Sequence, residues 1–207
     1  MRKIFLASSF SDVAIIFEDN IKDCKGKRAT FIKTASLVEK VVFYVESGKK
    51  ALEKIGIIVD ELEVSTASSE EISDKLTKNE YIYLTGGNTF FLLQELKRSG
   101  ADKIIIEQVE AGKLYIGESA GAMVASPNIE YVKAMDSVKK APELENFDAL
   151  GLVDFYTVPH CTNFPFKKAA EKIIVQHSNL LLYPISNKDA ILVDGDEVRV
   201  EPKKLEP

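Results

Sequence analysis

A serine flanked by glycines two residues away on each side follows an apolar run in the middle of this chain. The segment Gly117-Glu118-Ser119-Ala120-Gly121 comes directly after Leu114-Tyr115-Ile116 and before a run of small residues. Strand, serine turn and helix start together form the G-x-S-x-G nucleophile elbow, which projects a serine hydroxyl above a sheet. The glycines remove Cβ atoms that would collide in so tight a turn. Ser119 is therefore a candidate nucleophile.

The chain has two histidines that could serve such a serine as general base. His160 opens a loop after the strand-like run Val153–Val158 and Pro159. His177 ends a helical pattern, where the helix dipole already favours a positive charge. We therefore expect His160 to take the Ser119 proton. The third, acidic residue stays open by spacing alone, because several carboxylates lie between the serine and the histidine: Glu130, Asp136, Glu143, Glu145 and Asp148.

A glycine turn ends another strand-like run. Gly86-Gly87-Asn88 follows Tyr81–Leu84 and opens a helical pattern, so its free N–H groups could bind an anion or an oxyanion. It fits neither the Walker A spacing nor the dinucleotide-binding fingerprint. Functional groups gather at the carboxyl ends of strands in open α/β sheets. The glycine turn, Ser119 and His160 all follow strand-like runs, which indicates one site.

The composition predicts one globular domain spanning residues 1–207. The chain is 45% hydrophobic and 29% charged, with a net charge of −5 and a pI near 5.3, so we expect no nucleic-acid partner. No apolar run approaches the roughly 18 residues of a membrane span. Ser8 and Ser9 interrupt the apolar start, so a signal peptide is not expected. Two cysteines without metal-binding spacing favour a cytoplasmic protein without a zinc site.

Strand-like runs alternate with helical patterns along the chain, which predicts an α/β fold with a mainly parallel sheet covered by helices on both faces. A hairpin signal at Asp194-Gly195-Asp196 predicts an antiparallel addition at the sheet edge. The expected helices are Val13–Cys24, Leu37–Ile55, Ser68–Leu76, Thr89–Lys97, Ala101–Ala111 and Phe166–Gln176. The expected strands are Ile4–Ala7, Ala29–Ile32, Ile57–Val59, Tyr81–Leu84, Leu114–Ile116, Val153–Val158, Leu180–Ile185, Ala190–Val193 and Glu197–Val200.

Three segments in this order resemble the peptidase E family of serine dipeptidases. They are Leu84–Phe90, Gly117–Ala122 and Pro159-His160, with further similarity in Ser126–Ile129 and Phe147–Leu152. The resemblance implies a three-layer, class I glutamine amidotransferase-like (flavodoxin-like) fold and hydrolysis of short peptides through an acyl-enzyme. It implies no cofactor or metal, and a monomer or homodimer.

By position, the resemblance implies Ser119 as nucleophile, His160 as base and Asp136 as the acid, with Glu130 as runner-up. The oxyanion hole would come from the N–H groups of Gly87 and Ala120, within a substrate-binding turn that includes Gly86 and Asn88.

Two departures bear on the substrate. Glu118 stands where an aromatic residue is common in the family, and Cys161–Lys168 lacks the arginine-containing, glycine-rich segment expected to grip an N-terminal aspartate. Strict Asp-X specificity is therefore not expected, because lysine cannot reproduce a bidentate arginine clamp. An esterase or amidase, or a non-catalytic small-ligand-binding protein on the same scaffold, stays as an alternative. A glutamine amidotransferase would need cysteine at position 119.

Overall fold

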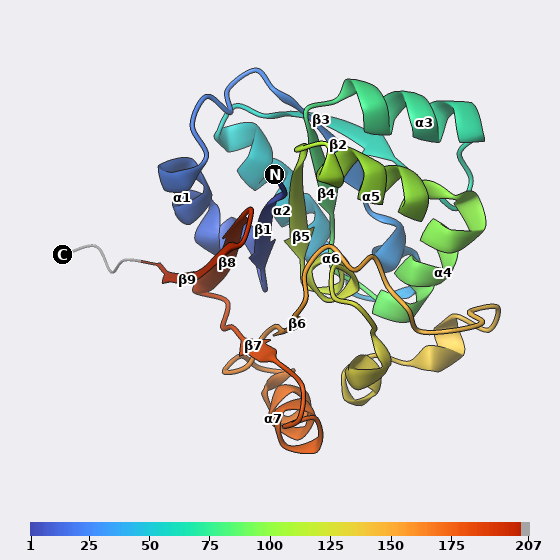
Figure 1. The fold of residues 1–207 in the computed structure, drawn as a ribbon, viewed down its shortest axis with the longest axis vertical. Coiled ribbons are helices and arrows are strands. Elements are labelled where there is room, and N and C mark those ends of the chain that lie inside the picture. The colour runs from blue at the N-terminus through green and yellow to red at the C-terminus, as the bar shows by residue number, and fades with distance from the viewer. Residues whose placement is uncertain (204–207) are drawn as a thin grey trace.

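A seven-stranded sheet forms the centre of the computed structural model, which describes residues 1–203 (Figure 1). Its strand order is β3-β2-β4-β5-β1-β8-β9, and the first five of these run parallel. The hairpin β8-β9 adds to β1 in antiparallel orientation and ends the sheet, as the sequence predicts. The strands are β1 (Lys3–Ala7), β2 (Arg28–Ile32), β3 (Ile58–Leu62), β4 (Tyr81–Leu84), β5 (Leu114–Glu118), β8 (Asp189–Asp194) and β9 (Glu197–Pro202).

Helices cover both faces of the sheet, which confirms the predicted three-layer α/β fold. Successive side chains alternate between the faces, so Phe5 and Tyr83 join one core while Leu6 and Leu84 join the other. Helices α1 (Phe10–Asn20) and α2 (Phe43–Lys54) pack on the first face. The other face carries α3 (Ser69–Lys78), α4 (Thr89–Ser99), α5 (Ala101–Glu110) and α6 (Ala120–Val124).

The helix predicted for Leu37–Ile55 is shorter than expected. A 3₁₀ turn, η1 (Thr34–Val38), is followed by extended backbone, and α2 begins only at Phe43. The carbonyl oxygen of Ala35 accepts the N–H of Asn88 at 2.9 Å, so it is committed to the glycine turn rather than to a helix. Val41 and Val42 are 62% and 44% exposed, so the apolar pattern that predicted the helix is not a buried stripe.

The strand that precedes His160 lies outside the central sheet, contrary to the prediction that it shares the same edge. β6 (Tyr156–Val158) pairs in parallel with β7 (Leu182–Pro184) in a separate two-stranded sheet, and α7 (Lys167–Gln176) connects them. Figure 1 shows this unit beside the ends of β1 and β5. Two 3₁₀ turns, η2 (Glu130–Ala134) and η3 (Val138–Lys140), lie in the segment after α6.

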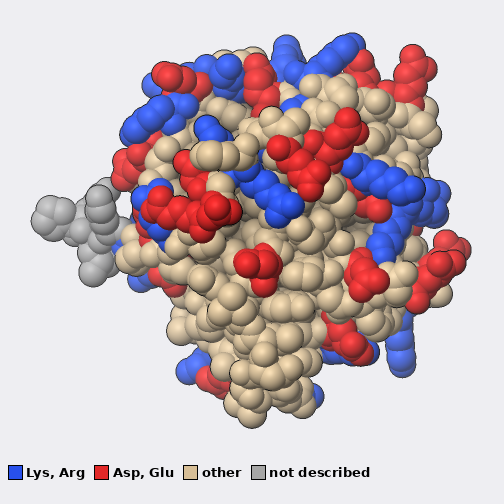
Figure 2. Space-filling model, in the orientation of Figure 1, with Lys and Arg blue, Asp and Glu red and all other residues tan. Residues whose placement is uncertain are grey.

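Charged side chains of both signs are interspersed over the face shown in Figure 2, and few lie over its lower part. Within residues 1–203, no helix combines the length and apolar character needed to cross a bilayer. The same residues contain no cluster of three or more His, Cys, Asp or Glu side chains placed to hold a metal ion.

Candidate active site

Ser119 occupies a strained turn between β5 and α6. Its φ of 50° and ψ of −104° lie outside the regions that L-residues ordinarily adopt, at a cost on the order of 1–3 kcal/mol. The turn is held by the Ser119 N–H, which donates to Ala7 O at 2.9 Å, and by the Ser119 carbonyl, which accepts from Ala122 and Met123. The sequence thus forms the predicted elbow, with a partly exposed serine among buried neighbours.

The glycines of the elbow are required by close backbone approach. A Cβ on Gly121 would lie 2.2 Å from the carbonyl oxygen of Leu84, and one on Gly117 would lie 2.6 Å from that of Gly121. A Cβ on Gly86 would lie 3.2 Å from Cβ of Ser119. The elbow therefore packs directly against the end of β4, and this contact brings the glycine turn next to the nucleophile.

The side chains of Ser119 and His160 meet as the sequence predicts. Ser119 Oγ lies 2.9 Å from His160 Nε2, although 41 residues separate them in the chain. His160 has a φ of 60°, and its backbone N–H donates to Ser8 Oγ at 2.9 Å. Phe166 stacks on the imidazole with ring centroids 5.0 Å apart. Backbone, hydroxyl and aromatic contacts thus fix the orientation of the histidine.

The other imidazole nitrogen contacts an asparagine. His160 Nδ1 lies 2.8 Å from Oδ1 of Asn187, a residue in the turn between β7 and β8. When Oδ1 accepts the Nδ1 proton, Nε2 is left with a lone pair that can accept the Ser119 hydroxyl proton. Burial lowers the pKa of His160, and the hydrogen bond to Asn187 opposes that shift. Burial thus favours the neutral imidazole, the form that a general base needs.

The structure does not bring either predicted acid to His160. Asp136 Oδ2 instead accepts from the N–H and the hydroxyl of Thr89, at 2.8 and 2.6 Å. Glu130 is exposed and pairs with Lys133 at 2.7 Å. The prediction of Asp136 at Nδ1 is thus corrected: its carboxylate binds the first turn of α4, where helix N–H groups need acceptors. Burial raises the pKa of Asp136 to about 6, against the lowering effect of the Thr89 bonds.

The predicted oxyanion turn lies beside the nucleophile. Gly87 has a φ of 136°, and a Cβ there would lie 2.2 Å from the backbone of Ala35, so only glycine fits. Among residues 1–203, the N–H groups of Gly87 and Ala120 donate to no other group. The side chain of Asn88 is occupied elsewhere, because Oδ1 caps α4 at Phe91 N and Nδ2 donates to Ser137 O.

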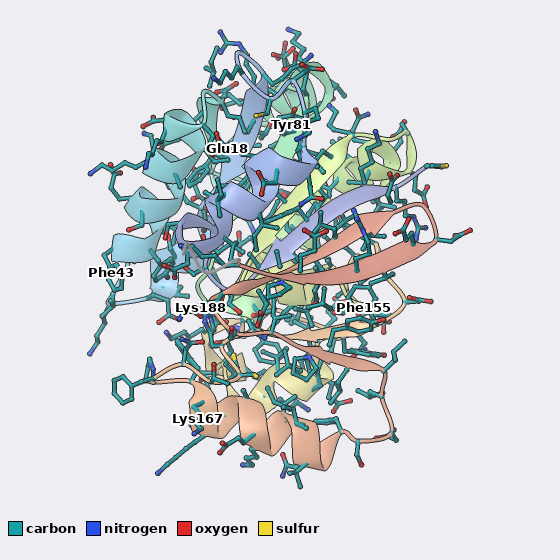
Figure 3. The ribbon with its side chains drawn as sticks, turned by 90° about the vertical axis from the view of Figure 1, so that its left-hand side faces the viewer. Glu18, Phe43, Tyr81, Phe155, Lys167 and Lys188 are labelled. Atoms are coloured by element: carbon teal, nitrogen blue, oxygen red, sulfur yellow. The ribbon has the colours of Figure 1, made fainter. Side chains whose placement is uncertain are left out.

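Apolar side chains flank the Ser119–His160 pair on two sides. The ring of Tyr44, at the start of α2, would lie 3.4 Å from a Cβ on Gly86, and its neighbour Phe43 is 72% exposed. Phe166 stacks on the imidazole, and Phe164, two residues earlier in the chain, is 95% exposed. Figure 3 labels Phe43 and Lys167, the first residues of α2 and α7.

Comparison with known proteins identifies the family of this chain. Residues 4–201, nearly the whole described chain, match the sequence pattern of peptidase family S51. The chain belongs to peptidase family S51. An uncharacterized peptidase, Lin0382, from Listeria innocua is 59% identical over 96% of this chain and 95% of its own length. Peptidase E from Salmonella arizonae is 37% identical over 67% of this chain and 57% of its own length.

Solved structures confirm the fold of this S51 peptidase. A candidate peptidase E protein from Listeria monocytogenes EGD-e superposes with a TM-score of 0.95 at 57% identity, over 98% of both chains. A peptidase from an acI-B1 Actinobacterium superposes with a TM-score of 0.69 at 20% identity, over 98% of this chain and 88% of that one, and supports the fold alone. The resemblance to the peptidase E family is thereby confirmed, and the chain is a peptidase.

Sequence reasoning missed Asn187 and Ser8. A signal for Asn187 was present, because Ser186-Asn187 follows the strand-like run Leu180–Ile185 just as the other site residues follow theirs. The triad precedent places a carboxylate between Ser119 and His160 in the sequence, and Asn187 is an amide that lies after the histidine. Ser8 follows β1 in the same way, at a strand end that no motif marks.

Proposed function

We propose that this S51 peptidase is a serine-type exopeptidase that releases single residues from short peptides, dipeptides above all. The observation that carries the proposal is the 2.9 Å contact between Ser119 Oγ and His160 Nε2 in an elbow whose serine is strained and partly exposed. Activated serine nucleophiles are recognised by this geometry, with a base in hydrogen-bond reach and a third group orienting the base.

In the proposed reaction, Ser119 Oγ attacks the scissile carbonyl carbon while His160 Nε2 takes the hydroxyl proton. The N–H groups of Gly87 and Ala120, which have no partner among residues 1–203, would donate to the oxyanion of the tetrahedral intermediate. His160 then gives its proton to the leaving amine, and the acyl-enzyme forms. Water, deprotonated by His160, attacks the acyl carbon, and Ser119 leaves with the proton returned by the histidine.

Asn187 takes the third position in this proposal. Its Oδ1 selects the tautomer with the proton on Nδ1, as asparagine does in the Cys-His-Asn arrangement of other peptidases. A neutral amide orients the ring without a negative charge to stabilise the imidazolium. The base is therefore expected to have a lower pKa than a carboxylate partner would give it.

Negative charge beside the glycine turn supports action at a free N-terminus. The pKa of Tyr44 is raised above its usual value, first by burial and then by the charges of Glu39, Glu118 and Asp136. Lys140 is already paired with Glu39 at 2.7 Å. We assign Asp136, fixed to Thr89 at the start of α4, as the carboxylate that pairs with the α-ammonium group of the substrate.

The arginines of the chain do not support recognition of an acidic side chain. All lie away from the elbow: before β1, at the start of β2, near the end of α4 and in β9, at positions Arg2, Arg28, Arg98 and Arg199. Aromatic rings lie at the site instead: Phe166 stacks on the His160 imidazole, and Tyr44 lies beside Gly86. We therefore expect neutral and apolar N-terminal residues to be accepted at least as well as aspartate.

A dipeptide panel with free and N-acetylated termini tests the proposal. Wild type should hydrolyse free dipeptides with neutral N-terminal residues, and Ser119→Ala should lower kcat on the order of 10⁶-fold. N-acetylation should abolish hydrolysis. Asp136→Asn should raise KM for free dipeptides, whereas Glu130→Gln should change neither kcat nor KM.

Unchanged hydrolysis by Ser119→Ala would contradict the proposal. Turnover of matched esters alone would favour an esterase, and a folded protein that neither turns over peptides nor reacts with a fluorophosphonate would favour a ligand-binding role.

A further inference from the structure

Glu118 is a buried carboxylate directly before the nucleophile that the proposed reaction leaves unused. It is the last residue of β5 and is 3% exposed. Its hydrogen-bond partners among residues 1–203 are both uncharged: Phe10 N at 2.9 Å to Oε1 and Tyr83 OH at 2.9 Å to Oε2. A buried carboxylate without a cation is costly, so the fold tolerates it only where its acceptor capacity is used.

The partners of Glu118 lie next to the two turns that complete the site. Tyr83 is in β4, the strand that leads into the Gly86–Gly87 turn, and the backbone of Gly86 is near enough to Glu118 to lower the pKa of its carboxyl. Phe10 begins α1, and two residues earlier Ser8 accepts the backbone N–H of His160 at 2.9 Å. One side chain therefore lies between the strand that carries the proposed oxyanion turn and the turn that supports the base.

The surroundings of Glu118 are shaped around it. A Cβ on Gly48 of α2 would lie 2.7 Å from Tyr83 Oη and 3.2 Å from Glu118 Oε2, so the helix passes directly over this pair. Tyr83 is itself fixed by a stacked contact with Phe31 at 4.9 Å between ring centroids. The carboxylate thus has little freedom to move, which is what a fixed anchor for two backbone turns requires.

We propose that Glu118 is a positioning residue whose ionised carboxylate holds the Gly86–Gly87 turn and the Ser8–Phe10 turn in register with Ser119. The role rests on the proposed serine mechanism, since it acts through the oxyanion donor and the base. An ionised carboxylate accepts from Phe10 N and from the Tyr83 hydroxyl at the same time, whereas a carboxyl protonated on Oε2 would donate to Tyr83 Oη and so reverse that bond. The geometry of the site is therefore linked to the protonation state of Glu118.

The charged and titratable groups that face Glu118 come from three elements: Asp12 of α1, Tyr44 of α2 and Tyr83 of β4. Burial raises the pKa of Glu118 to about 7, with Asp12 adding to the rise and the bonds from Phe10, Tyr83 and Gly86 opposing it. The carboxylate is thus ionised above neutral pH and protonated below it. The hydrogen bonds that Glu118 makes with Phe10 and Tyr83 should therefore change as pH falls through this range.

Glu118→Gln tests the positioning role, with Glu18→Gln on the exposed side of α1 as the matched control. We expect kcat to fall on the order of 100-fold, because misplacement of a site by about 1 Å has that effect, while KM stays within about threefold. In wild type the acid limb of kcat/KM should follow three ionisations, those of Glu118, Asp136 and His160. The Gln variant should lack the ionisation of Glu118. Wild-type kinetics and an unchanged acid limb in that variant would overturn the proposal.

Amide proton shifts of Phe10 and Gly86, followed by NMR from pH 5 to 9, decide the role without any substrate. In wild type both should titrate with one midpoint near neutral pH, and in Glu118→Gln neither should. Independent or absent titration in wild type would overturn the proposal, even if peptides are hydrolysed. Conversely, joint titration in a protein that hydrolyses no peptide would refute the peptidase mechanism but leave the positioning role of Glu118 standing.

If Glu118→Gln does not fold, Tyr83→Phe replaces it. This variant loses a hydrogen bond that lowers the pKa of Glu118, so the titration midpoint should move to higher pH. An unmoved midpoint would overturn the proposal.

Discussion

The backbone N–H of His160 donates a 2.9 Å hydrogen bond to the side chain of Ser8, a residue 152 positions earlier in the chain. The hydroxyl of Ser8 in turn donates to Ile185 O at 3.2 Å, two residues before Asn187. The end of β1 thus supports both the base and the group that orients it. The central sheet thus helps to fix the geometry of the candidate site, even though β6 and β7 form a separate sheet.

Ser8→Ala should therefore weaken both the fold and the reaction. It leaves the buried His160 N–H without its acceptor, and such a loss typically costs about 1–3 kcal/mol. Because His160 holds a φ of 60°, its loop should relax and the Ser119 contact should lengthen. We expect kcat to fall roughly 10–100-fold by misalignment. Urea unfolding and dipeptide kinetics measure the two effects. Ser9→Ala is the control, because within residues 1–203 the Ser9 hydroxyl hydrogen-bonds only to that of Ser11.

Substitutions of Asn187 should separate orientation from charge. Asn187→Ala removes the acceptor at Nδ1 and should lower kcat on the order of 100-fold or more, because the reactive tautomer is no longer selected. Asn187→Asp places a carboxylate there, which stabilises the imidazolium and raises the pKa of His160. The protonated, inactive base then persists to higher pH, so the acid limb of kcat/KM should move upward. A pH profile that is unchanged in both variants would exclude Asn187 from the site.

The elbow, the parallel sheet and the C-terminal hairpin could be predicted because each is encoded in short, contiguous patterns. The late start of the helix predicted for Leu37–Ile55 could not be predicted in this way. The carbonyl of Ala35 in the preceding 3₁₀ turn accepts the N–H of Asn88, which lies far along the chain. The partner of His160 was mispredicted for a similar reason. Asp136 has the expected chemistry but is held by Thr89, while Asn187 reaches Nδ1 through a turn that no motif marks. Pairings between distant turns depend on packing rather than on local sequence.

Gly121→Ala should be among the most damaging single-methyl changes in this chain. The added Cβ would lie 2.2 Å from the Leu84 carbonyl oxygen and 2.9 Å from Leu84 Cβ, and neither can move without displacing β4. We expect a loss of at least about 3 kcal/mol in unfolding free energy, in the range of severe overpacking. Gly26→Ala is the control: its φ is 80° but nothing lies within 4 Å, so it should cost about 1 kcal/mol. Equal losses would show that the elbow does not pack against β4.

The burial of Glu118 should also appear in the pH dependence of stability. Its pKa rises from 4.5 to about 7 on folding, so the folded state binds this proton more tightly than the unfolded chain. Stability is therefore lost as pH rises from about 4.5 to about 7, by up to about 3 kcal/mol, and is constant above that range. Glu118→Gln has no such slope. Its unfolding free energy relative to that of wild type should therefore rise by about 3 kcal/mol between pH 4.5 and pH 8.

Urea unfolding at several pH values measures this difference in unfolding free energy. The contribution of Asp136 cancels, because both proteins contain it. Parallel stability curves would mean that Glu118 keeps its charge in the folded protein, whereas a slope confined to wild type would show that the anchor beneath Ser119 is retained at a cost in stability.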